Sequence, residues 1–211
     1  MSDSRELDRA HAAVNSSRMG DPDIRQTLLR ELSSERTHDP ETVVLEEVGL
    51  RHGTARVDVL VVNGCLHGYE VKSEKDTLRR LANQVAVYGD VLDFVTIVVT
   101  EKHLPDAERC IPEWWGIMRA EAANSERVAL VELRRPVPNP SPNALAIAKL
   151  LWRDEALAFL VEVGESKGLL SKPRAFLYSR IVSCVDLDTL RSRVRRQLRC
   201  RTDWRSGAPS G

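Results

Sequence analysis

Two acidic residues and a lysine lie close together in one short apolar stretch of the chain. Asp58 stands in the segment RVDVLVV, Glu70 and Lys72 stand in the segment GYEVKS, and Asn63-Gly64 lies between the two segments. Their apolar, Val-rich character, with a turn dipeptide between them, predicts two strands of a hairpin. Glu70 and Lys72 are two apart, so they share one face of their strand. Charges on the inner face of an apolar hairpin cost free energy, so this set indicates a chemical role.

Hydrolysis of a phosphodiester bond is the chemistry that these residue types fit. Mg²⁺ prefers carboxylate oxygens and retained waters, and in such sites it activates water and neutralises phosphate charge. We expect Asp58, Glu70 and the carbonyl of Val71 to hold Mg²⁺, for which Mn²⁺ could substitute, and Lys72 to orient or deprotonate the attacking water. The alternative is an exposed strand face on which opposite charges pair without chemistry.

The hairpin loop decides whether the two carboxylates can meet. A two-residue turn at Asn63-Gly64, which this dipeptide favours, would place Asp58 opposite Tyr69 and point Glu70 away from it. A three-residue loop that ends at Cys65 would place Asp58 opposite Glu70. The metal site therefore predicts the three-residue loop or a bulge.

A predicted helix after the hairpin adds Gln84 and Tyr88, which are four apart and share a helix face. Together with Asp58 and Glu70-Val71-Lys72, in this order, the Gln-x-x-x-Tyr pair resembles the PD-(D/E)XK nuclease superfamily. The likeness is closest to its RecB-like branch and to a bacterial group of predicted nucleases. It is strongest from about residue 21 to about residue 100, and it departs from the usual pattern in that no Pro precedes Asp58.

The resemblance implies a restriction-endonuclease-like fold and a metal-dependent nuclease, with DNA favoured over RNA as the substrate. It implies that Gln84 and Tyr88 support the substrate beside the metal. It also implies a further acidic ligand from the first helix or first strand. Glu47 is favoured for that role, and Glu31 and Glu46 are the alternatives.

The elements around this stretch are expected to alternate between helix and strand. Such an order predicts an α/β fold with a mixed central sheet flanked by helices. Helices are expected over residues 21–34, 76–91 and 105–110, and strands over 42–48, 57–62, 66–71, 94–100 and 127–133. The pair Trp114-Trp115 would either stack on a base or close an edge of the core.

The chain divides by composition into five parts. We expect a flexible arm over residues 1–18, a nuclease-like domain over 19–134, a Pro-rich linker over 135–142, a helical basic region over 143–204 and a disordered tail over 205–211. The helical region should hold helices over 144–163, 172–185 and 188–198.

The formal net charge of zero conceals a basic C-terminal region. Residues 143–211 hold 13 Lys and Arg against 7 Asp and Glu. Seven arginines are concentrated near the end, at Arg191, Arg193, Arg195, Arg196, Arg199, Arg201 and Arg205. They would follow a phosphate backbone, or pair with acidic residues of the first domain, of a second subunit or of a partner protein.

Further features of the sequence bear on the compartment, on zinc binding and on the use of ATP. No apolar run approaches the ~18 residues of a membrane span, and the first residues are polar, so we expect a cytoplasmic protein without membrane contact. The four cysteines form no CxxC pair, which favours free thiols over zinc ligands. The chain has no GxxxxGK[ST] loop for ATP. The alternative to a nuclease is a non-catalytic module that binds nucleic acid or protein.

Overall fold

Strand and helix patterns of the sequence assemble into one mixed sheet with helices on both faces. The computed structural model describes residues 20–36, 39, 41–50, 53–123, 127–165 and 167–201. The expected arm over 1–18 and tail over 205–211 lie outside these residues. The strands are β1 (Val43–Leu50), β2 (Ala55–Val62), β3 (Leu66–Lys72), β4 (Phe94–Thr100), β5 (Gly116–Ala122) and β6 (Val128–Arg134). The helices are α2 (Asp21–Arg36), η2 (Leu78–Arg80), α3 (Leu81–Val91), α4 (Leu104–Cys110), α5 (Ala144–Ala148), α6 (Arg153–Glu162), α7 (Arg174–Cys184) and α8 (Leu187–Cys200).

The six strands lie in the sheet in the order of the chain, from β1 to β6. The pairs β1–β2, β2–β3 and β5–β6 are antiparallel, and β3–β4 and β4–β5 are parallel. The two parallel connections run through α3 and α4, as a parallel crossover requires. The prediction of an α/β fold with a mixed central sheet flanked by helices is confirmed.

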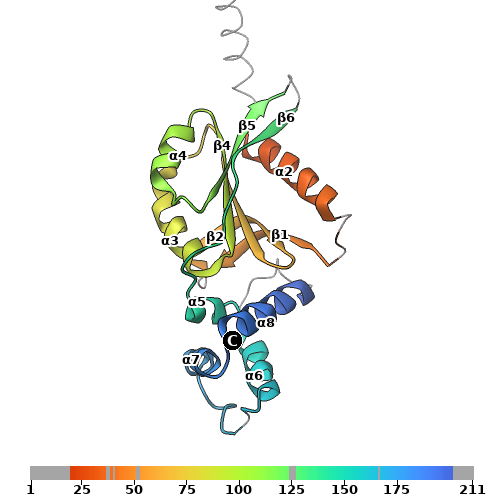
Figure 1. Ribbon diagram of the computed structural model, residues 1–211, viewed down its shortest axis with the longest axis vertical. Helices are drawn as coiled ribbons and strands as arrows, with labels where there is room; N and C mark the ends of the chain where they lie inside the picture. Colours follow the sequence, from red (N-terminus) through yellow and green to blue (C-terminus); the bar gives the residue numbers. More distant parts are fainter. Residues whose placement is uncertain are drawn as a thin grey trace, which may run out of the picture.

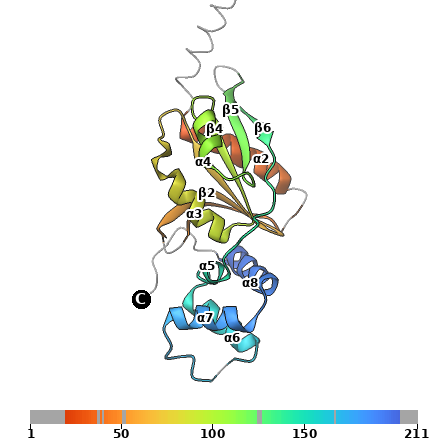
Figure 2. The same ribbon diagram turned by 60° about the vertical axis from the view of Figure 1, so that its left-hand side comes forward.

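Helices cover the two faces of the sheet separately (Figure 1). On one face, α2 packs its apolar stripe of Ile24, Leu28 and Leu32 on strand residues that include Val59, Val71 and Val98. On the other face, α3 and α4 contribute to a larger core. Figure 2 shows the same arrangement from a second direction, with the C-terminal helices gathered at one end of the sheet.

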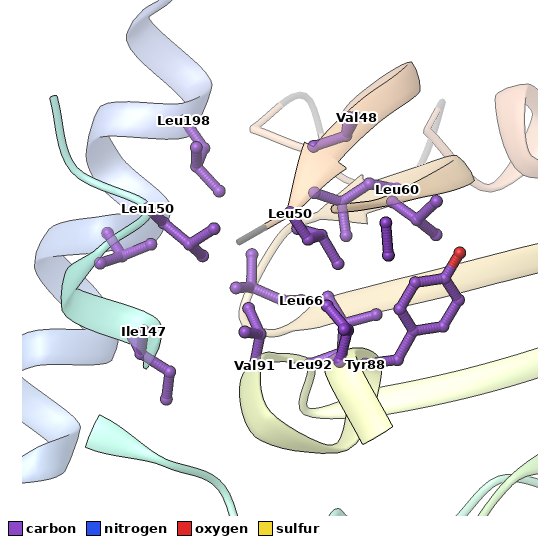
Figure 3. Close-up of a cluster of buried hydrophobic side chains, with 14 of the residues drawn as sticks. Val48, Leu50, Leu60, Leu66, Tyr88, Val91, Leu92, Ile147, Leu150 and Leu198 are labelled. Atoms are coloured by element: carbon purple, nitrogen blue, oxygen red, sulfur yellow. The ribbon is translucent and has the colours of Figure 1, made fainter. Parts of the chain in front are cut away.

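The helical region shares the larger core with the sheet domain. Ile147, Leu150 and Leu198 belong to the same buried cluster as Val91 and Leu92 at the end of α3 (Figure 3). Asp93, next along the chain, forms ion pairs with two arginines of α8, Arg191 at 3.0 Å and Arg195 at 3.9 Å. The region is therefore packed against the sheet domain by both apolar and charged contacts.

The Pro-rich segment 135–142 is bonded to the sheet domain along its length. The amide of Val137 donates to the carbonyl of Trp114 at 3.0 Å. The side chain of Asn139 donates to the carbonyls of Gly89 and Leu92 at 2.7 and 2.8 Å, which are the orphan acceptors at the end of α3. These bonds hold the segment as a strap across the end of α3.

Two expected elements differ from those observed, and one observed strand was not expected. The helix expected over 76–91 begins with a 3₁₀ turn at 78–80 and becomes α-helical only at Leu81, because Asp76 is used in a turn with Ser73. The helix expected over 144–163 is two helices, and Glu155 caps the second by accepting from the Trp152 amide. Strand β5 was not expected. Among the described residues, no helix has the length and apolarity that a membrane span requires.

Candidate functional site

The β2–β3 hairpin has the register that the chemistry requires. Val62 pairs with Leu66, which leaves a three-residue loop from Asn63 to Cys65. The Asn63 side chain accepts a hydrogen bond from the Cys65 amide at 3.0 Å, which closes that loop. The ladder continues to the pair Val59–Tyr69. The prediction of a three-residue loop is confirmed, and Asp58 and Glu70 are the residues that follow the last ladder pair on the two strands.

Strand β2 stops pairing with β3 at Asp58. Instead of a backbone bond, the Asp58 carboxylate accepts from the Val71 amide of β3, with Oδ2 2.8 Å from the nitrogen. Val57 and Leu60 both belong to the larger core although they are three apart, so β2 changes face at Asp58. The break in the ladder lets the Asp58 side chain lie between the two strands.

The Glu70 carboxylate is enclosed by three donors. Its residue is 1% exposed. Lys72 Nζ and Gln84 Nε2 each donate to Oε1 at 2.5 Å, and the Tyr88 hydroxyl is 2.6 Å from Oε2. Gln84 and Tyr88 lie one turn apart on the face of α3 that packs on the sheet. The structure thus brings together four of the predicted site residues.

Tyr88 also connects this cluster to β2. The Tyr88 hydroxyl is 2.6 Å from the carbonyl of Arg56, and it accepts a hydrogen bond from Gln84 Nε2 at 3.3 Å. A hydroxyl has one proton, so it can donate to Glu70 or to Arg56 but not to both. Burial first, and then the charge of Glu70, raise the pKa of Tyr88 well above its ordinary value, so the phenol stays neutral.

The pKa of Asp58 is raised into the neutral pH range by its surroundings. Burial is the largest cause, and the neighbouring charge of Glu70 is the second; together they raise the pKa of Asp58 to about 7. The Val71 amide, Arg25 and Lys72 oppose this rise. Two close carboxylates that are not fully neutralised by the chain itself suit a bound cation.

The third acidic residue that the structure brings near Asp58 is Glu47. It lies between the ladder pairs Glu46–Val59 and Val48–Val57, so it stands opposite Asp58 on β1. Its φ of 56° is in the left-handed region. Burial acts against ionisation, but hydrogen bonds from Arg25 and Arg56 outweigh it and hold the pKa of Glu47 below its ordinary value. Glu47 is exposed, as are the two alternatives, Glu31 and Glu46, so its place opposite Asp58 and its contact with Arg25 are what favour it.

Arg25 of α2 is a functional candidate that the sequence did not reveal. Its guanidinium donates to Asp58 Oδ1 at 3.1 Å and to Asp21 Oδ2 at 3.3 Å, and it also bonds Glu47. In the sequence it is only a charged residue beside the apolar stripe of a helix. Its role depends on how α2 lies across the sheet, for which the sequence carries no signal.

Arg119 is a second residue that was missed, because its strand β5 was missed. The register aligns Lys72 with Val99 and Val99 with Arg119, so both basic residues lie in one row across the sheet. Arg119 pairs with Glu101 at 3.2 Å and with Glu121 at 2.9 Å. Arg119 thus lies two strands away from Lys72, and its charge is compensated by these two carboxylates.

The donor set fits a divalent cation bound through oxygen. The carboxylates are Asp58, Glu70 and, beyond Arg25, Glu47, and these are hard ligands of the kind Mg²⁺ prefers. The side chain of Val71 packs in the core beneath α2, so only its carbonyl could take part. Gln84 Oε1 is buried with no hydrogen-bond partner among the described residues, and a metal-bound water could satisfy it. Within the same residues, no three His, Cys, Asp or Glu side chains are close enough to form a ready metal cluster.

Two other predicted sites have mainly structural contacts. Trp115 is fully buried and stacks on Tyr88 with ring centroids 5.9 Å apart, so it closes the core and is not available to a base. Six of the seven arginines near the C-terminus lie within the described part of the chain, and five of these pair with acidic residues outside their own helix. These pairs are Arg191–Asp93, Arg193–Glu162, Arg195–Asp93, Arg199–Glu41 and Arg201–Glu155.

Comparisons with known proteins place the chain in a phage family. It belongs to the family described as Bacteriophage P4 protein cII, whose model matches residues 15–207. Protein cII of Enterobacteria phage P4 is 26% identical over 85 residues, which are 40% of this chain. The match spans 32% of that protein, about a third of its length.

A solved structure, the SPO1766 protein of unknown function from Silicibacter pomeroyi, is also similar in part. It is 21% identical to this chain, and the match covers 49% of this chain and 64% of that one, with a TM-score of 0.35. Structural similarity at this level does not establish a shared fold.

Proposed function

We propose that this protein is a divalent-metal-dependent nuclease that hydrolyses phosphodiester bonds in DNA, on a restriction-endonuclease-like sheet. The observation that carries the proposal is the enclosure of Glu70, which is 1% exposed and bonded to Lys72, Gln84 and Tyr88, with the Asp58 carboxylate on the amide of the adjacent Val71. The preference for DNA over RNA rests on the sequence resemblance to the PD-(D/E)XK superfamily.

A purely structural purpose explains this cluster poorly. A buried ion pair loses the hydration of both charges, and apolar side chains of similar size are commonly as stable or more so. Here a Glu, a Lys, a Gln and a Tyr hydroxyl occupy the interior beside a second carboxylate. The contacts within this set stabilise the fold little, because they are offset by the free energy that desolvation of the polar groups costs. A hydrolytic site, in contrast, needs each of these residues.

Each residue has a role in the proposed reaction. Asp58 and Glu70 would hold the cation, with Glu47 completing the acidic set. When bound, the cation supplies activation of water and neutralisation of phosphate charge. Lys72 would orient the attacking water and offset the charge that develops on the phosphate. Gln84 and Tyr88 fix the Glu70 carboxylate from α3, so it is already oriented before substrate binds.

A cleavage assay with matched variants tests the proposal. Purified protein is incubated with single- and double-stranded DNA and RNA, with Mg²⁺ or Mn²⁺ and with EDTA. Lys72→Ala should lower the cleavage rate by about 100-fold or more, the usual range for a group that acts on the reacting water. Lys75→Ala is the control, because Lys75 is exposed three residues further along the same segment.

Two outcomes would contradict a nuclease. Cleavage that is equal in wild type, Lys72→Ala and Glu70→Gln would come from a contaminant. Binding of nucleic acid without cleavage in the wild type would instead identify a non-catalytic binding module. Nucleic-acid binding by Lys72→Ala, measured by fluorescence anisotropy, separates loss of chemistry from loss of affinity.

A further inference from the structure

Arg25 bridges three carboxylates that come from three different elements. Its guanidinium bonds Asp21 on its own helix, Glu47 on β1 and Asp58 on β2. The side chain of Arg25 is 17% exposed and that of Asp58 is 18% exposed, so the contact is largely shielded from solvent. Arg25 is therefore the resident cation at the acidic end of the candidate site.

We propose that a divalent cation binds at this site by displacing the guanidinium of Arg25 from Asp58 and Glu47. The inference rests on the proposed metal site. In this inference Arg25 competes with the metal for the two carboxylates. The sequence resemblance implies no such role for Arg25.

The contacts of Asp58 make the two cations alternatives. Oδ2 accepts from the Val71 amide, and Oδ1 accepts from Arg25 at 3.1 Å. A dication bound to Oδ1 would lie within a few ångströms of the guanidinium, where like charges in a shielded setting repel strongly. The metal and Arg25 therefore compete for the same carboxylate oxygen.

The contacts of Glu47 lead to the same conclusion. One of its oxygens bonds Arg25 and the other bonds Arg56 at 3.0 Å. Glu47 adopts a left-handed backbone conformation that is unfavourable for a residue with a β-carbon. Arg25 lies between Glu47 and Asp58, so these two carboxylates share one ligand only after the guanidinium leaves.

Metal affinity of variants measures this competition directly. Mn²⁺ binding is followed by isothermal titration calorimetry at pH 7.5 for wild type, Arg25→Gln and the control Arg30→Gln, whose residue is exposed on the same helix. Removal of the competing cation should tighten Mn²⁺ binding by on the order of tenfold or more, the factor that corresponds to one charge-assisted hydrogen bond. Arg30→Gln should bind Mn²⁺ as the wild type does.

A second measurement uses the unaltered protein, because Arg25→Gln leaves carboxylates unpaired and could fold poorly. The side-chain Nε–Hε signal of Arg25 is followed by NMR as Mg²⁺ is added. Displacement predicts a shift that saturates with Mg²⁺, while the signal of Arg30 stays in place. An Arg25 signal that does not move while Mg²⁺ binds elsewhere in the site would overturn the inference.

The outcomes separate this inference from the nuclease proposal. Equal or weaker Mn²⁺ binding by folded Arg25→Gln refutes competition, and cleavage by the wild type would still support the nuclease. Failure of both proteins to bind Mn²⁺ also refutes competition. Tighter binding by Arg25→Gln together with a wild type that cleaves no nucleic acid supports the competition and refutes the nuclease.

Discussion

Replacement of the buried Glu70–Lys72 pair tests whether the cluster is retained for chemistry or for stability. Glu70 is 1% exposed and Lys72 is 4% exposed, and their charged atoms are 2.5 Å apart. Lys72→Met removes one charge and leaves the other buried, which costs about 3–5 kcal/mol in comparable pairs. In Glu70→Gln/Lys72→Met no charge of the pair remains. The oxygen of the new amide accepts from Gln84 Nε2, and its amino group donates to the Tyr88 hydroxyl, which then donates to the Arg56 carbonyl.

The double variant should therefore be as stable as the wild type or more stable by about 1–4 kcal/mol, although the single variant is destabilised. The measurement is urea unfolding at pH 7.5, followed both by circular dichroism and by tryptophan fluorescence. Trp115 stacks on Tyr88 and reports on this part of the core. Coincident transitions and equal m values would justify the comparison of free energies.

The control is an ion pair at the surface. Arg180 bonds both oxygens of Glu165 in the helical region, and this pair is partly exposed. Glu165→Gln/Arg180→Met should change the unfolding midpoint little. A double variant at Glu70 and Lys72 that is clearly less stable than the wild type would refute the reasoning, because it would show that the charged pair stabilises the fold.

Three further predictions concern the same site and the segment that supports it. First, Asp58 has a folded pKa of about 7, above its value in the unfolded chain, so its contribution to stability is present at acid pH and is lost as the pH rises from ~4 to ~7. Compared with Asp58→Asn, the wild type should lose up to about 4 kcal/mol of its free energy of unfolding over this pH range. If urea unfolding gives parallel pH profiles for the two proteins, the pKa of Asp58 is not raised. Second, Tyr88→Phe removes a donor shared by Glu70 and the Arg56 carbonyl and should lower the free energy of unfolding by about 1–3 kcal/mol, measured in urea. Third, Asn139→Ala leaves two carbonyls at the end of α3 without their side-chain donor and should cost about 2–3 kcal/mol, read from the thermal unfolding midpoint; an unchanged midpoint would show that water replaces the amide.

The hairpin and its chemistry could be predicted from the sequence because both depend on local patterns. The length of the loop at Asn63-Gly64 sets the register of the two strands. Because side chains alternate between faces along a strand, that register decides which of the three charged residues lie together. If Asp58 and Glu70 are to meet, the loop must contain three residues, and the structure has that register. The Asn63-Gly64 dipeptide alone would have predicted a two-residue turn, and the requirement that the two carboxylates meet predicted the loop correctly.

Strand β5 and the role of Arg25 could not be predicted in this way. The segment GIMRAEA has few β-branched residues and is a strand because it pairs with β4 on one side and β6 on the other. Arg25 reaches Asp58 across 33 residues of sequence, and this contact exists only because α2 packs on the face of the sheet where it contacts β1, β3 and β6. Both features are set by long-range packing, which a local pattern does not encode.

The basic C-terminal helix shows how packing selects among alternatives that composition leaves open. Of the alternatives for its arginines, pairing with acidic residues of the first domain is observed for Arg191 and Arg195 with Asp93, and for Arg199 with Glu41. The Asp93 carboxylate also accepts from the Leu66 amide at 2.8 Å. The arginines therefore serve first to attach α8 to the sheet.

Helix α3 links the candidate site to the helical region. Gln84 and Tyr88 hold the Glu70 carboxylate, and Val91, three residues after Tyr88 at the end of the helix, packs in the same cluster as Ile147 and Leu198. A displacement of α5 or α8 would act on the end of α3, and α3 is stiff over its three turns, so the displacement would reach the donors of Glu70. The helical region thus contributes to the geometry of the site without supplying a residue to it, and the segment 135–142 that connects the two is bonded to α3 at the point where they meet.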